Sequence, residues 1–409
     1  MNISKLSIKN YRSCTSIEFS PNQGLSALIG PNGSGKTNIL SAIKLLSNLT
    51  DTRSRHLIRD DIQTSISEIK VWFNWNGKSI IYTAKLNLVT NEKNQDEVLA
   101  NSQSWYMYQV TGSKRNISIP IEIISDLFME RQFISSQRGI RNIQFSRFIR
   151  HFGLRSEELP AIEAVGKFLS DIRYYSASQF TNPTNCPISF EVEEASDSRR
   201  GISITGHKRL LYDMYEEFKS NSDSYNEFLS LIGKDGIGLV EEIDFKEIKT
   251  SSSKYTVMTG GKVKIKEKIN LLVVPSFRIA NSSLSPSQLS EGTFKTIALI
   301  FYLVTDKSSL LMIEEPEVCV HYGLLSSIVE LIKTYSQEKQ ILISTHSDAV
   351  LDALSIDNVF KVKRDKEKGT IVSSIVKKMG SKDLAALKDY LHNEGSLGEF
   401  WKHGDLEHV

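Results

Sequence analysis

The pattern of apolar and polar positions divides the chain into buried strands, alternating strands and helices. Short, predominantly apolar runs typical of buried strands occur at 25–29, 309–313 and 340–345. Alternating segments typical of half-buried strands occur at 69–73 and 79–88, with a turn at 74–78 between them. Apolar positions at helical spacing occur at 38–46, 121–130, 160–169, 208–219, 224–232 and 294–304. This mixture predicts an α/β fold.

The order of the segments predicts three parts. Residues 1–95 are expected to form strands around one helix, 96–270 an inserted lobe of helices and strands, and 271–409 the return to the core. Further strands are expected at 171–175, 255–274, 359–363 and 370–376. A chain of 409 residues exceeds what one hydrophobic core usually organises, which agrees with a core plus a large insertion. No heptad run is long enough for a coiled-coil arm.

A complete phosphate-binding loop follows the first buried strand. Its residues are Gly30, Pro31, Asn32, Gly33, Ser34, Gly35, Lys36 and Thr37. The glycines let successive N–H groups point at phosphate oxygens, and the following helix adds positive charge at its N-terminus. Lys36 is expected to reach the β- and γ-phosphates, and the Thr37 hydroxyl to help hold Mg²⁺. Because strand, loop and helix occur in order, the sequence predicts a nucleoside triphosphate site rather than a chance glycine-rich turn.

Three motifs downstream carry a family resemblance. Leu289 to Thr293 (Leu-Ser-Glu-Gly-Thr) opens a helix, Glu314 and Glu315 end one buried strand, and His346 ends the next. This order after a phosphate loop resembles that of ABC-type ATPases, and with Asn-Tyr-Arg-Ser at 10–13 it is similar to the RecF/OLD-like branch. The resemblance covers the two ends of the chain. It implies an ABC-type P-loop ATPase head with a central mixed α/β insertion and no long coiled-coil arm.

The acids and the histidine can be given roles. A metal-bound nucleotide needs an acid near Mg²⁺ and a separate group that positions the attacking water, and alternate side chains leave a strand on opposite faces. Glu314, where the family most often has Asp, is interpreted as the Mg²⁺-side acid, acting through a metal-bound water. Glu315 is then the water-positioning residue and His346 the γ-phosphate sensor. A charged turn and a structural histidine are the alternatives.

Three further residues have weaker support. Gln179 follows a strand as the family's metal-side glutamine does. Arg12 matches an N-terminal arginine that lies near the nucleotide in relatives, or it is a surface arginine. His321 falls where the family places a loop that crosses to the neighbouring subunit, or it caps a helix.

The Leu-Ser-x-Gly signature implies a dimer. In ABC-type ATPases this segment closes on the nucleotide of a second copy, so the resemblance implies a homodimer with two ATPs between subunits, or a larger assembly of dimers. Ser290 and Gly292 would face the partner's γ-phosphate. ATP and Mg²⁺ are the expected ligands.

Composition agrees with a cytoplasmic enzyme. The chain is 40% hydrophobic and 24% charged, as globular proteins are. No apolar stretch approaches the roughly 20 residues needed to cross a bilayer. The first residues follow the alternating pattern of a strand, so no signal peptide is expected there. Three widely spaced cysteines fit neither a disulfide frame nor a zinc site.

Two biological roles for ATP hydrolysis agree with the sequence. After His346 the acids are scattered and do not form the motif of a TOPRIM nuclease. This pattern is similar to the ATPase subunits of two-gene bacterial anti-phage systems such as PARIS, Septu or retron-associated pairs, in which the ATPase senses infection and controls a separately encoded effector such as a nuclease. Candidate partners are therefore an effector protein, DNA or a phage protein, and no membrane.

The alternative is a RecF-like ATPase of DNA repair or recombination. The segment 131–155 holds six arginines and four phenylalanines and no acid, a composition that suits phosphate contacts and stacking. An amphipathic helix or an interface to an acidic partner would have the same composition. Lysines alternate on one face of a strand at 262–268, and we interpret them as edge-strand lysines that block unwanted pairing rather than as DNA contacts. The balance of 50 basic to 48 acidic residues does not favour strong general affinity for DNA.

Overall fold

The computed structural model describes residues 1–49, 66–90, 96–98, 105–111, 117–120, 158–193, 206–257, 263–318, 320, 322–393 and 395–402. These residues form two compact units. The first contains Met1–Tyr174, Lys307–Pro316 and Val329–Val409, and the second contains Tyr175–Asp306 and Glu317–Ile328. Both units combine residues from more than one of the three sequence segments, so the division at residues 95 and 270 stays a prediction. The segment 131–155, the helix expected at 121–130 and His321 lie outside the described residues.

A mainly parallel sheet forms the centre of the first unit. Its strand order is β17-β16-β3-β15-β14-β9. Strands β16, β3, β15 and β14 are parallel, and β17 is antiparallel to β16. The bounds are Leu25–Ile29 for β3, Ile172–Ser176 for β9, Leu310–Glu314 for β14, Gln340–Thr345 for β15, Val359–Asp365 for β16 and Gly369–Ser374 for β17. Strands β3 and β15 are buried along their whole length and β14 up to Ile313, which explains why all three are mainly apolar in sequence.

A seven-stranded antiparallel sheet forms the second layer of this unit. Its order is β2-β1-β4-β5-β7-β8, with β6 paired to β5. The bounds are Asn2–Tyr11 for β1, Cys14–Phe19 for β2, Ile66–Trp75 for β4, Lys78–Thr90 for β5, Asp96–Val98 for β6, Trp105–Val110 for β7 and Ile117–Pro120 for β8. Alternate residues of β4, such as Ile69, Val71 and Phe73, are fully buried. The two alternating strands predicted from the sequence are therefore confirmed.

Two helices fill the core beside these sheets. Helix α1 (Lys36–Asn48) contributes Ile39, Leu40 and Ile43 to one apolar cluster with residues of β1, β4 and β5. Helix α4 (Leu159–Ser170) adds Phe168, whose ring meets Phe73 edge-on at 5.0 Å between centroids. The core therefore fixes the start of α1, which follows the phosphate loop directly.

The C-terminal part also contributes helices, and one predicted boundary changes there. Its helices are α8 (Tyr322–Tyr335), α9 (Asp348–Asp352), η6 (Ile356–Asn358), α10 (Ile375–Lys378), α11 (Ser381–Asn393) and α12 (Leu397–Lys402). The strand expected at 370–376 ends at Ser374, because the Ser374 side chain accepts a hydrogen bond from the Lys377 backbone N–H and caps α10.

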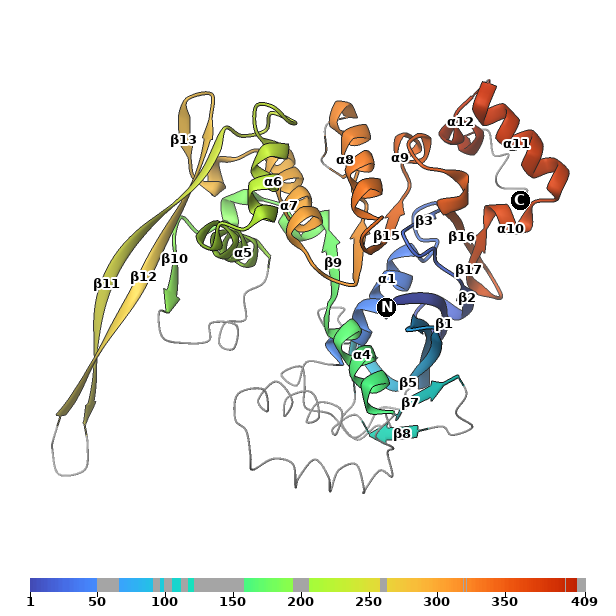
Figure 1. Ribbon diagram of the computed structural model, residues 1–409, viewed down its shortest axis with the longest axis horizontal. Coiled ribbons are helices and arrows are strands. Elements are labelled where there is room, and N and C mark those ends of the chain that lie inside the picture. Colours follow the sequence, from blue (N-terminus) through green and yellow to red (C-terminus); the bar gives the residue numbers. More distant parts are fainter. Residues whose placement is uncertain are drawn as a thin grey trace. The chain divides into compact units, whose positions relative to one another are not determined.

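The second unit pairs a long antiparallel ribbon with helices. Strands β11 (Glu242–Val257) and β12 (Val263–Ile279) form the ribbon visible in Figure 1, and β10 (Phe190–Glu193) and β13 (Ser282–Leu284) pair with β12. The helices are η2 (Ala177–Phe180), η3 (Pro183–Asn185), α5 (His207–Ser220), α6 (Asp223–Ile232), η5 (Pro286–Gln288) and α7 (Glu291–Thr305). The Phe228 and Phe301 rings join α6 to α7 at 5.3 Å between centroids.

The mixed α/β fold of an ABC-type P-loop ATPase head, expected from the sequence, is confirmed. Helix α7, with 15 residues, is the longest helix in the described ranges, so these ranges contain no coiled-coil arm. None of the helices that the structure describes combines the length and the apolar character that crossing a membrane requires.

Candidate nucleotide-binding site

The phosphate loop joins β3 to α1 in a conformation that only glycine adopts easily. Gly33 and Gly35 have φ values of +77° and +107°, in the region disfavoured for other residues. A Cβ atom on Gly35 would lie 2.1 Å from Thr370 Oγ1, and one on Gly30 would lie 2.1 Å from the Val362 carbonyl oxygen. The loop is therefore packed directly against β16 and β17.

Lys36 lies inside this loop. Its side chain is buried, and its ammonium donates to the Gly30 carbonyl at 2.7 Å and to the Pro31 carbonyl at 3.2 Å. The Ser34 hydroxyl is also buried, and within the described ranges it has no hydrogen-bond partner. Buried donors in a glycine-rich loop are the groups that a phosphate oxygen accepts from. These residues fit the predicted nucleotide.

Thr37 and Glu314 meet where α1 starts and β14 ends. The Thr37 hydroxyl donates to Glu314 Oε1 at 2.5 Å, and the Tyr174 hydroxyl donates to Glu314 Oε2. Lys44 of α1 lies over the Tyr174 ring at 4.4 Å; burial lowers the pKa of Lys44, and the charge of Glu314 opposes that shift. A hydroxyl and a carboxylate together suit Mg²⁺, which takes oxygen ligands. Thr37 and Glu314 would hold the ion, and its charge would neutralise phosphate oxygens.

Glu315 follows the last residue of β14 and has a backbone conformation that differs from that of the strand. Its φ is +48°, and its backbone N–H donates to the Ser344 carbonyl at 2.9 Å, across the parallel pair of β14 and β15. Its Oε1 atom lies 3.5 Å from His346 Nδ1. Both side chains are partly exposed, so they are accessible to a nucleotide and to water. The structure therefore brings the predicted water-positioning acid and the predicted phosphate sensor together.

A cavity of about 390 Å³ lies over the loop. Six of its lining residues were predicted from the sequence: Asn32, Gly33, Gly35, Lys36, Thr37 and Glu315. Two were not, Asn38 and Arg364. Arg364 lies near the end of β16, in a segment with no recognisable motif, so no sequence signal pointed to it.

A second group of residues, which the sequence did not predict, forms hydrogen bonds beside the phosphate loop. Ser13 Oγ lies 2.7 Å from Thr370 Oγ1 and accepts from Asn38 Nδ2 at 2.6 Å. Thr370 Oγ1 also lies 3.1 Å from the Ser34 carbonyl and donates to it. Ser13 belongs to the Asn-Tyr-Arg-Ser motif, which was the available signal. Arg12, next to it, stacks over the Tyr11 ring at 5.5 Å and does not line the cavity, so its contact with nucleotide stays a prediction.

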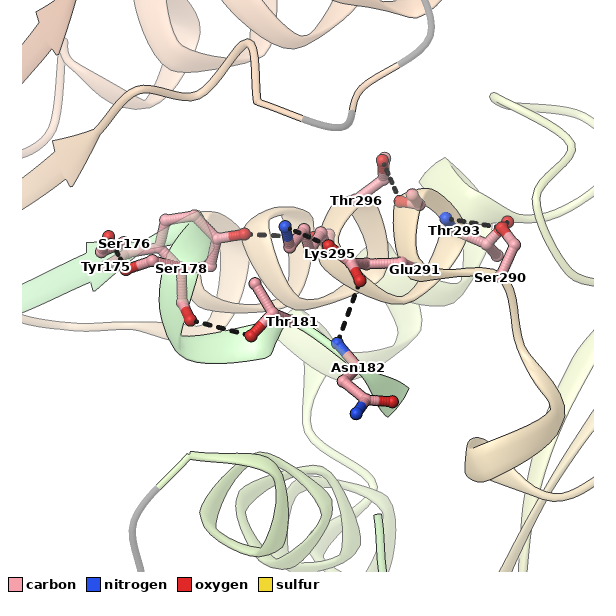
Figure 2. Close-up of polar contacts among 11 residues, drawn as sticks. Tyr175, Ser176, Ser178, Thr181, Asn182, Ser290, Glu291, Thr293, Lys295 and Thr296 are labelled. Carbon is pink, nitrogen blue, oxygen red and sulfur yellow. Dashed lines mark hydrogen bonds and ion pairs between the residues drawn. The ribbon is translucent and has the colours of Figure 1, made fainter. Parts of the chain in front are cut away.

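The signature segment starts α7 in the second unit. Ser290 is exposed and caps the helix by accepting from the Thr293 N–H at 3.1 Å, and Gly292 lies in the first turn. Glu291 is held by the buried Lys295 ammonium at 2.7 Å and by the Asn182 backbone N–H at 3.0 Å (Figure 2). These contacts hold the start of α7. Gln179 is exposed on η2 of the same unit, and its metal-side role stays a prediction.

A parallel sheet that carries a phosphate loop, an acid pair and a histidine to the ends of three adjacent strands is the arrangement of ABC-type P-loop ATPases. The chain is an ATP hydrolase of this class. It belongs to the AAA ATPase domain family, whose model matches residues 1–351.

Named relatives match over short segments. The DNA replication and repair protein RecF of Prosthecochloris aestuarii is 49% identical over 43 residues, 10% of this chain and 12% of RecF. The DNA double-strand break repair Rad50 ATPase of Methanopyrus kandleri is 38% identical over 71 residues, 17% of this chain and 8% of Rad50. The matches thus span 12% or less of these relatives. The SMC head domain from Thermotoga maritima is similar at a TM-score of 0.43 and 15% identity, over 91% of this chain and 99% of that domain.

Proposed function

We propose that the chain hydrolyses ATP at sites shared between two copies of itself. The observation that carries this proposal is the exposed, helix-capping position of Ser290 at the start of α7. An exposed helix N-terminus is suited to receive the γ-phosphate of a nucleotide held by the loop of another copy. The resulting dimer has twofold symmetry and two equivalent sites.

The described residues divide the work of hydrolysis. Lys36 and the loop N–H groups bind the β- and γ-phosphates, and Thr37 and Glu314 serve the metal side. Glu315 orients the attacking water, and His346, 3.5 Å away, senses the γ-phosphate and fixes the Glu315 carboxylate. Hydrolysis then removes the group that holds the two copies together, so the dimer closes with ATP and opens with ADP.

The proposed biological role is control of a separately encoded effector. The combined form of the motifs at 10–13, 30–37, 289–293, 314–317 and 344–347 resembles ATPases of two-gene bacterial anti-phage systems. On this proposal the cytoplasmic ATPase senses infection, and its closed and open dimers hold and release the effector, such as a nuclease.

The Glu315→Gln variant tests the shared site. It keeps size and hydrogen bonding but loses the charge that orients water, so ATP should bind, hydrolysis should stop, and the ATP-bound dimer should accumulate in analytical ultracentrifugation. Ser290→Arg should bind ATP as separate chains and not dimerise. Mixing Ser290→Arg with Lys36→Ala should restore one working site per dimer, measured by phosphate release. A mixture whose subunits exchange without any restored activity would refute the shared site.

A DNA-repair ATPase is the second candidate, because the short matches to RecF and to Rad50 favour it. A triple variant that removes Arg141, Arg147 and Arg150, outside the described residues, separates the two roles. If the role is DNA repair, duplex affinity should fall, and its salt dependence should flatten by roughly one logarithmic unit per lost phosphate contact. If the role is effector control, ATPase activity should persist while co-purification with the product of the neighbouring gene is lost.

A further inference from the structure

Arg364 is a cation in the nucleotide cavity that none of the ATPase motifs supplies. It lies on β16 and lines the cavity of about 390 Å³ together with Asn32, Gly33, Lys36 and Thr37 of the phosphate loop. Its side chain is exposed, so it is available to a ligand that enters the cavity.

The position of Arg364 is fixed by strand pairing. Strand β16 is parallel to β3, with Lys361 paired to Ile29 at the end of β3, so β16 continues beside the phosphate loop where β3 stops. Two residues before Arg364, the Val362 carbonyl lies against Gly30 so closely that a Cβ atom there would be 2.1 Å away. Directly opposite Arg364 on β17 is Thr370, which donates to the Ser34 carbonyl. The phosphate loop is therefore packed against the Val362 backbone and against the Thr370 side chain, one on each strand of the β16–β17 pair that carries Arg364.

The charges in the cavity favour a second cation. Lys36 is the one cation of the phosphate-loop motif, and Glu315 brings a negative charge to the same cavity. A triphosphate carries about three to four negative charges at neutral pH, of which a divalent ion compensates two. Across the described ranges, no ion pair joins Arg364 to an acid. A guanidinium is always charged and matches phosphate oxygens with parallel N–H donors.

We propose that Arg364 is a nucleotide-binding residue whose guanidinium charge contacts the phosphates of ATP. The inference rests on ATP binding at the phosphate loop and does not require the dimer of the proposed function. It assigns to the β16–β17 hairpin two tasks at one place, support of the loop through Thr370 and compensation of phosphate charge through Arg364.

Lys363 provides a matched control. It is the neighbouring residue on β16, it is also exposed and cationic, and it does not line the cavity. Successive residues of a strand point to opposite faces, so Lys363 has the same strand position and charge but the other orientation. Because both side chains are exposed, neither substitution should affect folding, and circular dichroism melting curves verify this.

Isothermal titration calorimetry with ATP and Mg²⁺ tests the inference. Arg364→Gln should raise the Kd for ATP about tenfold or more, as expected for a lost charged hydrogen bond, and Arg364→Lys should recover part of the loss. Lys363→Gln should stay within about twofold of the parent. A Kd for Arg364→Gln within twofold of the parent would overturn the inference. So would an equal loss in Lys363→Gln, or an Arg364→Lys variant that binds no better than Arg364→Gln.

A fourth variant, Lys36→Ala, distinguishes an error in the Arg364 inference from an error in the phosphate-loop site. Lys36→Ala should abolish measurable ATP binding. If it does while Arg364→Gln binds normally, the Arg364 inference alone is wrong. If Lys36→Ala binds ATP normally, the phosphate-loop site itself is wrong, and the Arg364 inference is wrong with it. Sedimentation measures dimer formation by Glu315→Gln independently. The absence of a dimer would therefore not affect the conclusions on the phosphate-loop site or on Arg364.

Discussion

Thr37 donates a hydrogen bond to Glu314 over a distance of 2.5 Å, although 277 positions separate the two residues in sequence. The contact exists because β3 and β14 both flank β15 in the parallel sheet, so the loop after β3 and the acid at the end of β14 meet at one edge. The second oxygen of Glu314 accepts from Tyr174 of β9, the neighbouring strand. The orientation of the carboxylate is thus set by groups from two sides.

Glu314→Gln should weaken Mg²⁺-dependent ATP binding more than Tyr174→Phe does. The glutamine can retain a hydrogen bond to Thr37 but has no charge for a metal ion, whereas the phenylalanine removes one hydrogen bond and leaves the carboxylate charged. We expect the Mg²⁺ concentration for half-maximal ATP binding to rise on the order of tenfold or more in Glu314→Gln, and less in Tyr174→Phe. Titration of Mg²⁺ at fixed ATP measures both, and equal effects would contradict the metal-side role of Glu314.

Thr370→Val should loosen the phosphate loop. The substitution keeps the shape of the buried side chain but removes the hydroxyl that bonds the Ser34 carbonyl and Ser13. Loss of these bonds should lower the free energy of unfolding by about 1–2 kcal/mol and raise the Kd for ATP, because the loop backbone is less well ordered.

Ser373→Ala, on the same strand and away from the loop contacts, is the control for Thr370→Val and should change neither quantity. Urea unfolding and calorimetry provide the two measurements. A Thr370→Val protein that is destabilised but binds ATP with unchanged affinity would show that the contact serves stability alone.

The pair of Glu291 and Lys295 should show asymmetric single-variant effects. The Lys295 side chain is 2% exposed and that of Glu291 40% exposed, with 2.7 Å between the charged atoms. Glu291→Ala removes the charged partner of a buried ammonium and should cost about 3 kcal/mol of stability, whereas Lys295→Met leaves a half-exposed carboxylate and should cost less. The double variant Glu291→Ala/Lys295→Met should be more stable than Glu291→Ala. Additive losses in urea unfolding would exclude this coupling.

Cys14 should make stability fall at alkaline pH. Burial raises the pKa of the Cys14 thiol from 9.0 to about 11. Between these values the unfolded chain loses the proton while the folded chain keeps it, so the stability present below pH 9 declines towards pH 11. The loss should amount to about 2 kcal/mol. Burial also raises the pKa of the Cys186 thiol, to about 12. Because Cys186 is retained in Cys14→Ala, the difference between the unfolding curves of parent and variant isolates the contribution of Cys14. Identical slopes from pH 9 to 11 would contradict this assignment.

The sequence predicted the parts of the site that have a local signature. The phosphate loop, the two acids and the histidine each follow an apolar run, and the structure places all of them at adjacent strand ends. The sequence could not predict Tyr174, Thr370 or Arg364. Each of these residues reaches the site through strand pairing that no local sequence pattern encodes. The boundary at Ser374 was missed because a serine cap ended the strand pattern early.

The convergence of β3, β15 and β14 links nucleotide binding to folding. The groups that we propose to bind ATP come from segments near residues 30, 314 and 346. No short stretch of chain carries the proposed site, so an unfolded chain should have little affinity for ATP. Ligand that binds the native state selectively adds about 2.7 kcal/mol of stability at a concentration of 100 Kd. Nucleotide supply should therefore govern the lifetime of this polypeptide against proteolysis, in addition to its catalytic cycle.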